Sequence, residues 1–116
     1  MDMKNTIKEV WRPLYTFYQN YEFGAYRSSY NIRPNKYEVS NTGKVRNIVT
    51  KKEYTIDNKG RVTLDVNDFT YYGKTGRCQF SVKRLVYSTF VRPLKYDERV
   101  YFKKGNYCCV DNLIAK

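Results

Sequence analysis

The chain contains no histidine and only three cysteines, three prolines and one tryptophan. Without histidine it lacks the side chain that most often serves as a general base near neutral pH. The three cysteines are odd in number and the first eight residues are polar and charged, so we expect free thiols and no disulfide framework. Three cysteines do not complete the four ligands of a structural zinc site, and we expect neither a metal nor a cofactor. No apolar run approaches the roughly 20 residues that span a bilayer, so no membrane association is expected.

Acidic residues are also scarce, because 11 Asp and Glu stand against 22 Lys and Arg and give a net charge of +11. The basic residues are spread along the whole length and do not form a tail. Such a surplus favours a polyanionic partner, most commonly nucleic acid, although virion and well-solvated proteins are also basic. The 13 tyrosines either line an interface, where they give rigid contact area, or reflect coding by an AT-rich genome.

At 116 residues the chain is expected to form a single domain. Residues 7–14 end in an Arg-Pro step and predict an edge strand or extended arm, with Trp11 anchored in the core. Seven aromatic residues then fall between Tyr15 and Tyr30. Their spacing matches neither a strand nor a helix cleanly, so an irregular or partly helical segment is expected there.

Hairpin signals follow after Pro34. Residues 37–47 are expected to form one hairpin around Asn41-Thr42-Gly43, with Gly43 supplying the positive φ of a tight turn. Further hairpins are predicted at 53–66 around the turn 57–60, at 69–80 around 73–76, and at 99–110 around 103–106. Residues 111–116 are expected to form at most a helical turn.

The apolar positions of residues 82–90 recur at helical spacing, after Ser81 as a plausible N-cap and before Pro93. Leu85 and Phe90 are expected in the core with Trp11 and Val62. The chain is therefore predicted to be an α+β protein, with a small antiparallel β-sheet of hairpins and one main α-helix.

Two segments resemble phage-type HNH homing endonucleases. The first matches the nuclease-associated DNA-binding motif Tyr-x-Val-Ser-Asn-x-Gly-x-Val-Arg and its preceding Glu-x-Trp-Arg, through Glu9, Trp11, Arg12, Tyr37, Val39, Ser40, Asn41, Gly43, Val45 and Arg46. The second, Val82 to Phe90, is similar to the family's helix, with Lys83 where the family usually has His. The resemblance implies a motif-like part at 1–66, with an aromatic insertion at about 15–36, and a degenerate HNH-like part at 67–116 that ends in a ββα-like unit.

The resemblance also indicates that catalysis has been lost. It places Tyr101 at the metal-ligand position and Phe102 at the position of the histidine base, and leaves only Asn112 of the motif. Phe102 has no lone pair, and a single neutral amide binds a hard divalent cation poorly. The chain is therefore expected not to be an enzyme.

Two surfaces are candidates for partners. The motif hairpin and the loop after it present basic residues expected to meet DNA phosphates, because a β-ribbon can lie on a duplex: Lys44, Arg46, Lys51, Lys52, Lys59 and Arg61. The insertion presents aromatic residues that favour a protein partner or a larger core: Tyr18, Tyr21, Phe23, Tyr26 and Tyr30.

These observations lead to two hypotheses. The first is a nuclease-dead, phage-encoded protein that binds nucleic acid, DNA in preference to RNA, in the cytoplasm of a bacterial host. The second is a protein-binding module of the same lineage, acting as an inhibitor of a host nucleoprotein or defence system, or as a virion component. Salt distinguishes them, because polyanion binding weakens steeply with ionic strength.

Overall fold

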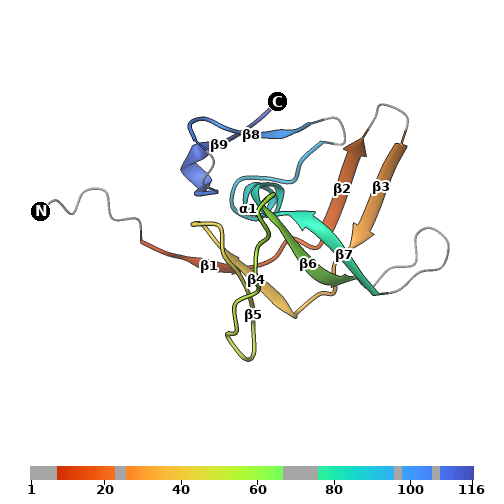
Figure 1. Cartoon of the computed structure of the whole chain (residues 1–116), viewed down its shortest axis with the longest axis vertical. Helices are drawn as coiled ribbons and strands as arrows, with labels where there is room; N and C mark the ends of the chain where they lie inside the picture. Colours follow the sequence, from red (N-terminus) through yellow and green to blue (C-terminus); the bar gives the residue numbers. More distant parts are fainter. Residues whose placement is uncertain (1–7, 23–25, 67–75, 96–97, 106–107) are drawn as a thin grey trace, which may run out of the picture.

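The computed structural model describes residues 8–22, 26–66, 76–95, 98–105 and 108–116, with the side chains of residues 17–31 outside this description. Within these residues, nine strands and one helix follow one another, with a 3₁₀ turn between the last two strands (Figure 1). They are β1 (Trp11–Pro13), β2 (Phe17–Glu22), β3 (Tyr26–Asn31), β4 (Tyr37–Ser40), β5 (Val45–Asn47), β6 (Arg61–Val66), β7 (Gly76–Ser81), α1 (Val82–Phe90), β8 (Val100–Phe102), η2 (Val110–Asn112) and β9 (Leu113–Ala115).

All strand pairings are antiparallel, which confirms the predicted α+β class. The strands form four small sheets: β1-β4-β5, β2-β3, β6-β7 and β8-β9. None of the described helices is long and apolar enough to cross a membrane. The last unit consists of two short strands joined through η2, and the main helix precedes it.

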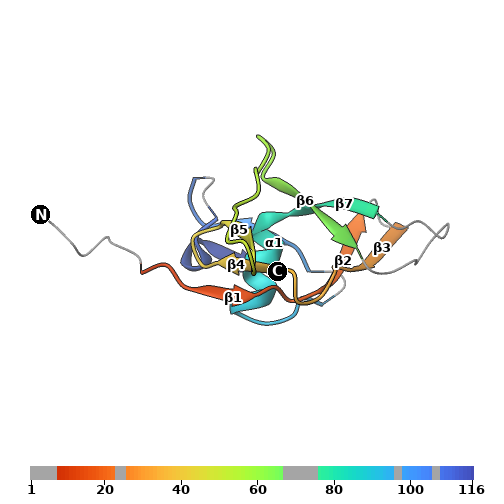
Figure 2. The same ribbon diagram turned by 90° about the horizontal axis from the view of Figure 1, so that it is seen from below.

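Helix α1 lies at the centre of the molecule, with β8 and β9 on one side and β4 and β5 on the other (Figures 1 and 2). Its residues Val82, Leu85 and Val86 are fully buried, because their spacing places them on the face that meets the sheets. Ser81 is the N-cap residue, but its side chain makes no capping hydrogen bond.

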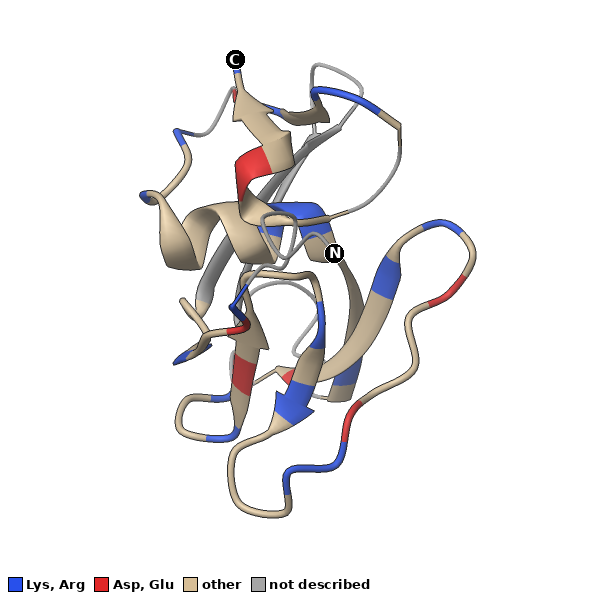
Figure 3. Cartoon of the chain, turned by 90° about the vertical axis from the view of Figure 1, so that its left-hand side faces the viewer, with Lys and Arg blue, Asp and Glu red and all other residues tan. Residues whose placement is uncertain are grey.

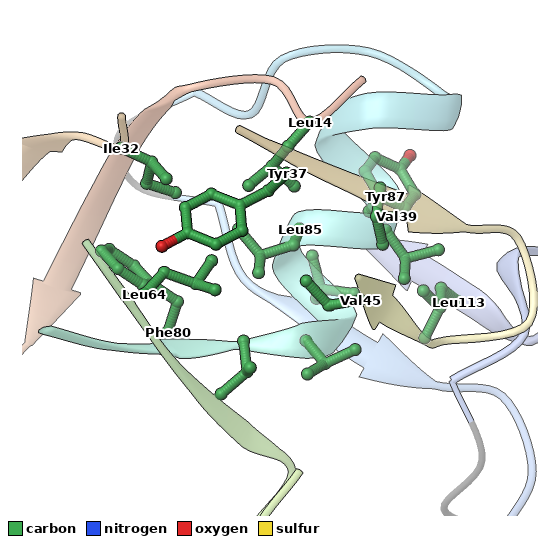
Figure 4. Close-up of a cluster of buried hydrophobic side chains, with 14 of the residues drawn as sticks. Leu14, Ile32, Tyr37, Val39, Val45, Leu64, Phe80, Leu85, Tyr87 and Leu113 are labelled. Carbon is green, nitrogen blue, oxygen red and sulfur yellow. The ribbon is translucent and has the colours of Figure 1, made fainter. Parts of the chain in front are cut away.

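Around this helix, the core gathers side chains from β4, β5, β6, β7, β8 and β9, together with Leu14 and Ile32 (Figure 4). Leu85 and Val62 are buried as predicted, and Phe90 packs partly buried against them. The remaining buried apolar residues are Leu14, Ile32, Tyr37, Val39, Val45, Leu64, Val66, Phe80, Val82, Val86, Tyr87, Val100 and Leu113. The predicted position of Trp11 was wrong: this residue is half-buried and lies outside the core cluster, and Leu14 is the core residue of this segment.

The prediction of an irregular or partly helical segment from Tyr15 to Tyr30 was also wrong. Residues 17–22 and 26–31 pair in full register as a hairpin, from Phe17 opposite Asn31 to Glu22 opposite Tyr26. Aromatic residues favour strands, and pairing the two segments satisfies backbone groups that an irregular segment would leave open. The period-two pattern typical of strands was hidden because aromatic residues occur at both odd and even positions of this hairpin.

Two further hairpins pair differently from the prediction. Residues 53–56 form no strand, apart from an isolated bridge between Glu53 and Arg46, and β6 pairs with β7 instead. The alternation of β6 buries Val62 and Leu64, and this apolar side matches β7, which carries the buried Phe80 opposite Val62. The predicted strand at 69–72 and most of its turn lie outside the described residues.

At the C-terminal end, β8 forms as predicted but its partner is β9, not residues 107–110. Leu113 lies opposite Phe102 and is buried, whereas residues 110–112 form the 3₁₀ turn. A buried leucine in register decides this pairing over the nearer segment, because the alternation of Leu113, Ile114 and Ala115 places one side of the strand against the core.

Candidate nucleic-acid interface

In the segment that resembles a DNA-binding motif, polar residues hold the N-terminal arm against the turn between β4 and β5. The Asn41 side chain accepts a hydrogen bond from the Val10 amide at 2.8 Å and donates one to the Lys8 carbonyl at 3.0 Å. The Thr42 hydroxyl contacts both the Glu9 carboxylate and the Ser40 hydroxyl. These side chains therefore stabilise the fold of the arm, and their polar atoms face the protein.

Arg46 is fixed in the same way. Its guanidinium lies over the Trp11 ring at 3.8 Å from the centroid, and its Nε donates to the Glu38 carboxylate at 2.6 Å. Lys51 approaches the same carboxylate at 3.3 Å. Burial works to raise the pKa of Glu38, but the hydrogen bonds from Arg46 and Lys51 outweigh it, and the pKa is lowered. Glu38 is thus ionised and holds Arg46 in place.

Gly43 joins this turn to the C-terminal unit. Its φ is +92°, and a Cβ at this position would lie 2.7 Å from the Cβ of Cys108. The Val110 amide also donates to the Asn41 carbonyl at 2.8 Å. The motif glycine is therefore required twice, for the left-handed backbone and for the close approach of another segment.

The loop after β5 is a preformed turn. The Asn47 side chain accepts hydrogen bonds from the amides of Val49 and Thr50, at 2.8 and 2.9 Å. Lys51 adopts a positive φ of 64° and donates its amide to the Asn47 carbonyl at 3.0 Å. This turn holds Lys51 and Lys52 exposed at the surface.

The six basic residues expected to contact phosphates differ in their surroundings. Arg61 pairs with Asp57 at 3.1 Å and Lys44 lies 3.7 Å from Glu9, in addition to the pairs of Arg46 and Lys51 with Glu38. Lys52 and Lys59 are exposed and form no ion pair with any residue that the structure describes. Blue positions recur along the segment that runs from β5 to β6 (Figure 3).

The charges of this segment are not balanced at the surface. Side chains of Lys44 and Lys51 are 51% and 56% exposed, whereas their partners Glu9 and Glu38 are 33% and 10% exposed. In each pair the carboxylate lies deeper than the cation. The outward face therefore presents positive charge, although most of its cations have a partner.

The three residues predicted to occupy degenerate active-site positions lie in β8 and η2, where they make contacts within the protein. The Asn112 side chain is buried and donates to the Lys104 carbonyl at 2.8 Å, which closes the loop after β8. The Phe102 ring is half-buried against the core, with the Lys83 ammonium 5.0 Å from its centroid. Tyr101 is exposed. Among the described residues, no three His, Cys, Asp or Glu side chains lie close enough to hold a metal ion.

The aromatic insertion places Tyr18 and Tyr30 opposite each other in β2 and β3, with Tyr21 opposite Arg27 and Tyr26 opposite Glu22. Phe23 lies outside the described residues. All three cysteines are free, and burial raises the pKa of the Cys108 thiol, so it is a poor nucleophile near neutral pH.

Sequence reasoning missed the role of Trp11 as a ring beneath Arg46 and the role of Glu38 as its anchor. The role of Glu38 could have been inferred from the hairpin register, because Glu38 lies opposite Arg46 in β4 and β5. Comparison of the chain with protein-family models, with curated proteins and with solved structures finds no match.

Proposed function

We propose that this protein binds duplex DNA without cleaving it, through the exposed cations of residues 44–61. The observation that supports this best is the unequal exposure within the ion pairs, because the ammonium groups of Lys44 and Lys51 are more exposed than the carboxylates of Glu9 and Glu38. A preformed turn presents two of these cations, so little chain entropy is lost when they meet phosphates. Phosphate contacts of this kind position a duplex without specifying its sequence.

Loss of the catalytic groups supports binding without chemistry. The position of the histidine base holds the Phe102 ring, which packs on the core, and the Asn112 amide already donates to the protein backbone. Neither group can activate water. Supercoiled DNA incubated with pure protein and Mg²⁺ or Mn²⁺ is therefore expected to remain uncut, and nicking that disappears in Asn112→Ala would overturn this part of the proposal.

Binding itself is tested by titrating a labelled duplex with protein at several salt concentrations. Four of the six cations, Lys44, Lys51, Lys52 and Lys59, end in exposed ammonium groups. With about −0.9 for each neutralised phosphate, log K should fall with log salt at a slope of about −3.6. A slope near zero, or no binding at low salt, would contradict the proposal.

One observation favours the second candidate, a protein-binding module that acts as an inhibitor of a host nucleoprotein or defence system, or as a virion component. The insertion forms a separate two-stranded sheet, β2–β3, linked to β6 by the bridge between Ile32 and Val66. A two-stranded ribbon is only marginally stable by itself, and a partner that adds contacts would stabilise it. A complex captured from infected cells that survives nuclease treatment and high salt, and disappears in Tyr21→Ala, would favour this candidate.

A further inference from the structure

The outer face of the β8–β9 ribbon contains exposed apolar side chains surrounded by cations. Tyr101 and Ile114 lie directly opposite each other in the two strands, and they are 41% and 42% exposed. Their neighbours Val100 and Leu113 point the other way and are buried. Strand alternation thus separates an inner apolar side, which packs on α1, from an outer side that nothing in the described part of the chain covers.

The same outer face places like charges opposite each other. The backbones of Arg99 and Lys116 exchange both hydrogen bonds of a ladder pair, at 3.1 and 2.9 Å. Arg99 lies two residues before Tyr101, and Lys116 lies two residues after Ile114. The side chains of Arg99 and Lys116 therefore lie on the same outer face as Tyr101 and Ile114. Like charges that face each other across a ribbon are unfavourable. A partner that brings negative charge to this face would remove that repulsion.

These cations are also free of carboxylate partners. Arg99, Lys103 and Lys116 are exposed and form no ion pair with any described residue. Of the acidic residues described in this unit, Glu98 is held by Arg92 and by the Lys95 amide, and Asp111 pairs with none of the described cations. In the segment from β5 to β6, by contrast, most cations have a carboxylate beside them.

The aromatic ring at the centre of this face selects the kind of anion. The Lys116 ammonium lies 5.4 Å from the centroid of the Tyr101 ring, in a cation–π contact that is weak at an exposed site. Stacking of a nucleobase on an aromatic ring is stronger, so a base can replace the ammonium, which is then free to meet the adjacent phosphate. A ring between three cations matches the alternation of bases and phosphates along an unpaired strand.

We infer that the outer face of β8–β9 binds single-stranded DNA, with one base stacked on Tyr101 and the flanking phosphates on Arg99, Lys103 and Lys116. A base inside a duplex is already stacked on both sides, so this face requires an unpaired strand. The choice of DNA over RNA rests on the proposed function, but the stacking site does not depend on residues 44–61. Strands β4 and β5 lie on the other side of α1 from β8 and β9 (Figure 1).

The test measures binding of the full chain to a labelled 12-nucleotide oligothymidine by fluorescence anisotropy. Tyr101→Leu keeps an apolar side chain but removes the ring, and is expected to weaken binding about tenfold. Tyr101→Phe keeps the ring and should bind as the unsubstituted chain does. Lys52→Gln and Lys59→Gln serve as the control on the other surface, and should weaken duplex binding while leaving oligothymidine binding unchanged.

A second measurement needs no substitution in the protein. An oligonucleotide of the same length built from abasic sites retains the phosphates and should bind about tenfold more weakly, with an unchanged salt slope. Equal binding of the abasic strand, or of a folded Tyr101→Leu variant, would overturn the stacking site. Tighter binding of oligouridine RNA would overturn the choice of DNA. Loss of duplex binding alone would count against the proposed function and leave this site standing.

Discussion

The two basic regions of this molecule use their charges in different ways. In the β1-β4-β5 region, Arg46 lies between a tryptophan ring and a carboxylate, and Lys44 and Lys51 stand beside partners that lie deeper than they do. On the β8–β9 ribbon, Arg99 and Lys116 face each other without a described carboxylate partner. Net charge therefore says little about which cations are available, because pairing within the protein decides it.

The motif residues also differ from the exposed cations in what they contact. The motif residues Ser40, Asn41 and Arg46 make hydrogen bonds or stacking contacts within the protein. The cations with exposed ends, such as Lys52 and Lys59, lie outside the motif pattern. A recognisable motif thus marks the scaffold here, and the groups that would touch a ligand stand on the loops that the scaffold holds.

The largest effect is expected where the two regions meet, at Gly43. Gly43→Ala forces a side chain into a left-handed backbone and against the Cys108 Cβ, 2.7 Å away, and should lower the free energy of unfolding by about 3 kcal/mol. Gly60 offers a matched control, since its φ is +77° but no atom lies within 4 Å. Gly60→Ala should cost about 1 kcal/mol, from the backbone alone. Equal costs in urea denaturation would mean that the two regions do not pack closely at Gly43.

Arg46 tests whether the motif is structural. Arg46→Ala removes the stack on Trp11 and leaves Glu38 with Lys51 as its remaining ion-pair partner, so it should destabilise the fold by about 2 kcal/mol. Arg46→Lys keeps the charge but loses the planar stack and should cost about half as much. The salt slope of duplex binding should stay the same in a folded Arg46→Gln variant, which removes the charge. A flatter slope with unchanged stability would show that Arg46 contacts phosphate.

Low pH should lower the stability of the fold, because a carboxylate in each of the two regions has a lowered pKa. Hydrogen bonds from Arg92 and from the Lys95 amide lower the pKa of Glu98 to about 2, from an ordinary value of 4.5. Because the folded-state pKa is the lower one, this contribution to stability is present above about pH 4.5 and is lost as the pH falls towards 2.

Glu38 lies in the other region and its pKa is also lowered, so its contribution is lost in the same direction. Glu98→Gln and Glu38→Gln should each flatten the fall in melting temperature between pH 5 and pH 2, as followed by circular dichroism. If the melting temperature of Glu98→Gln falls between pH 5 and pH 2 as steeply as that of the unsubstituted protein, the pair of Glu98 with Arg92 is not formed in solution.

Local patterns predicted the elements better than their partners. Gly43 in its turn and the helical spacing of residues 82–90 fixed a hairpin and a helix, because each is decided within a few residues. The partners of β6 and β8 were missed because pairing depends on which distant apolar residue, Phe80 or Leu113, completes the buried side. Trp11 was misplaced for a related reason, since only the register of β1, β4 and β5 brings Arg46 onto its ring. The cations of the candidate interface were visible in the sequence, but their pairing was not.

The smallest effect on stability is expected for cations that have no ion-pair partner among the described residues. Lys52→Gln and Lys59→Gln remove exposed ammonium groups that form no ion pair with any described residue. Surface substitutions of this kind change stability by less than about 0.5 kcal/mol, so each melting temperature should stay within about 3 °C. Each should nevertheless flatten the salt slope of duplex binding by about 0.9, and weaken all sequences alike. Lys116→Gln is the counterpart on the other region and should flatten the slope for oligothymidine only. If all three substitutions changed both slopes equally, the two regions would form one continuous surface for nucleic acid, and the division between them would fail.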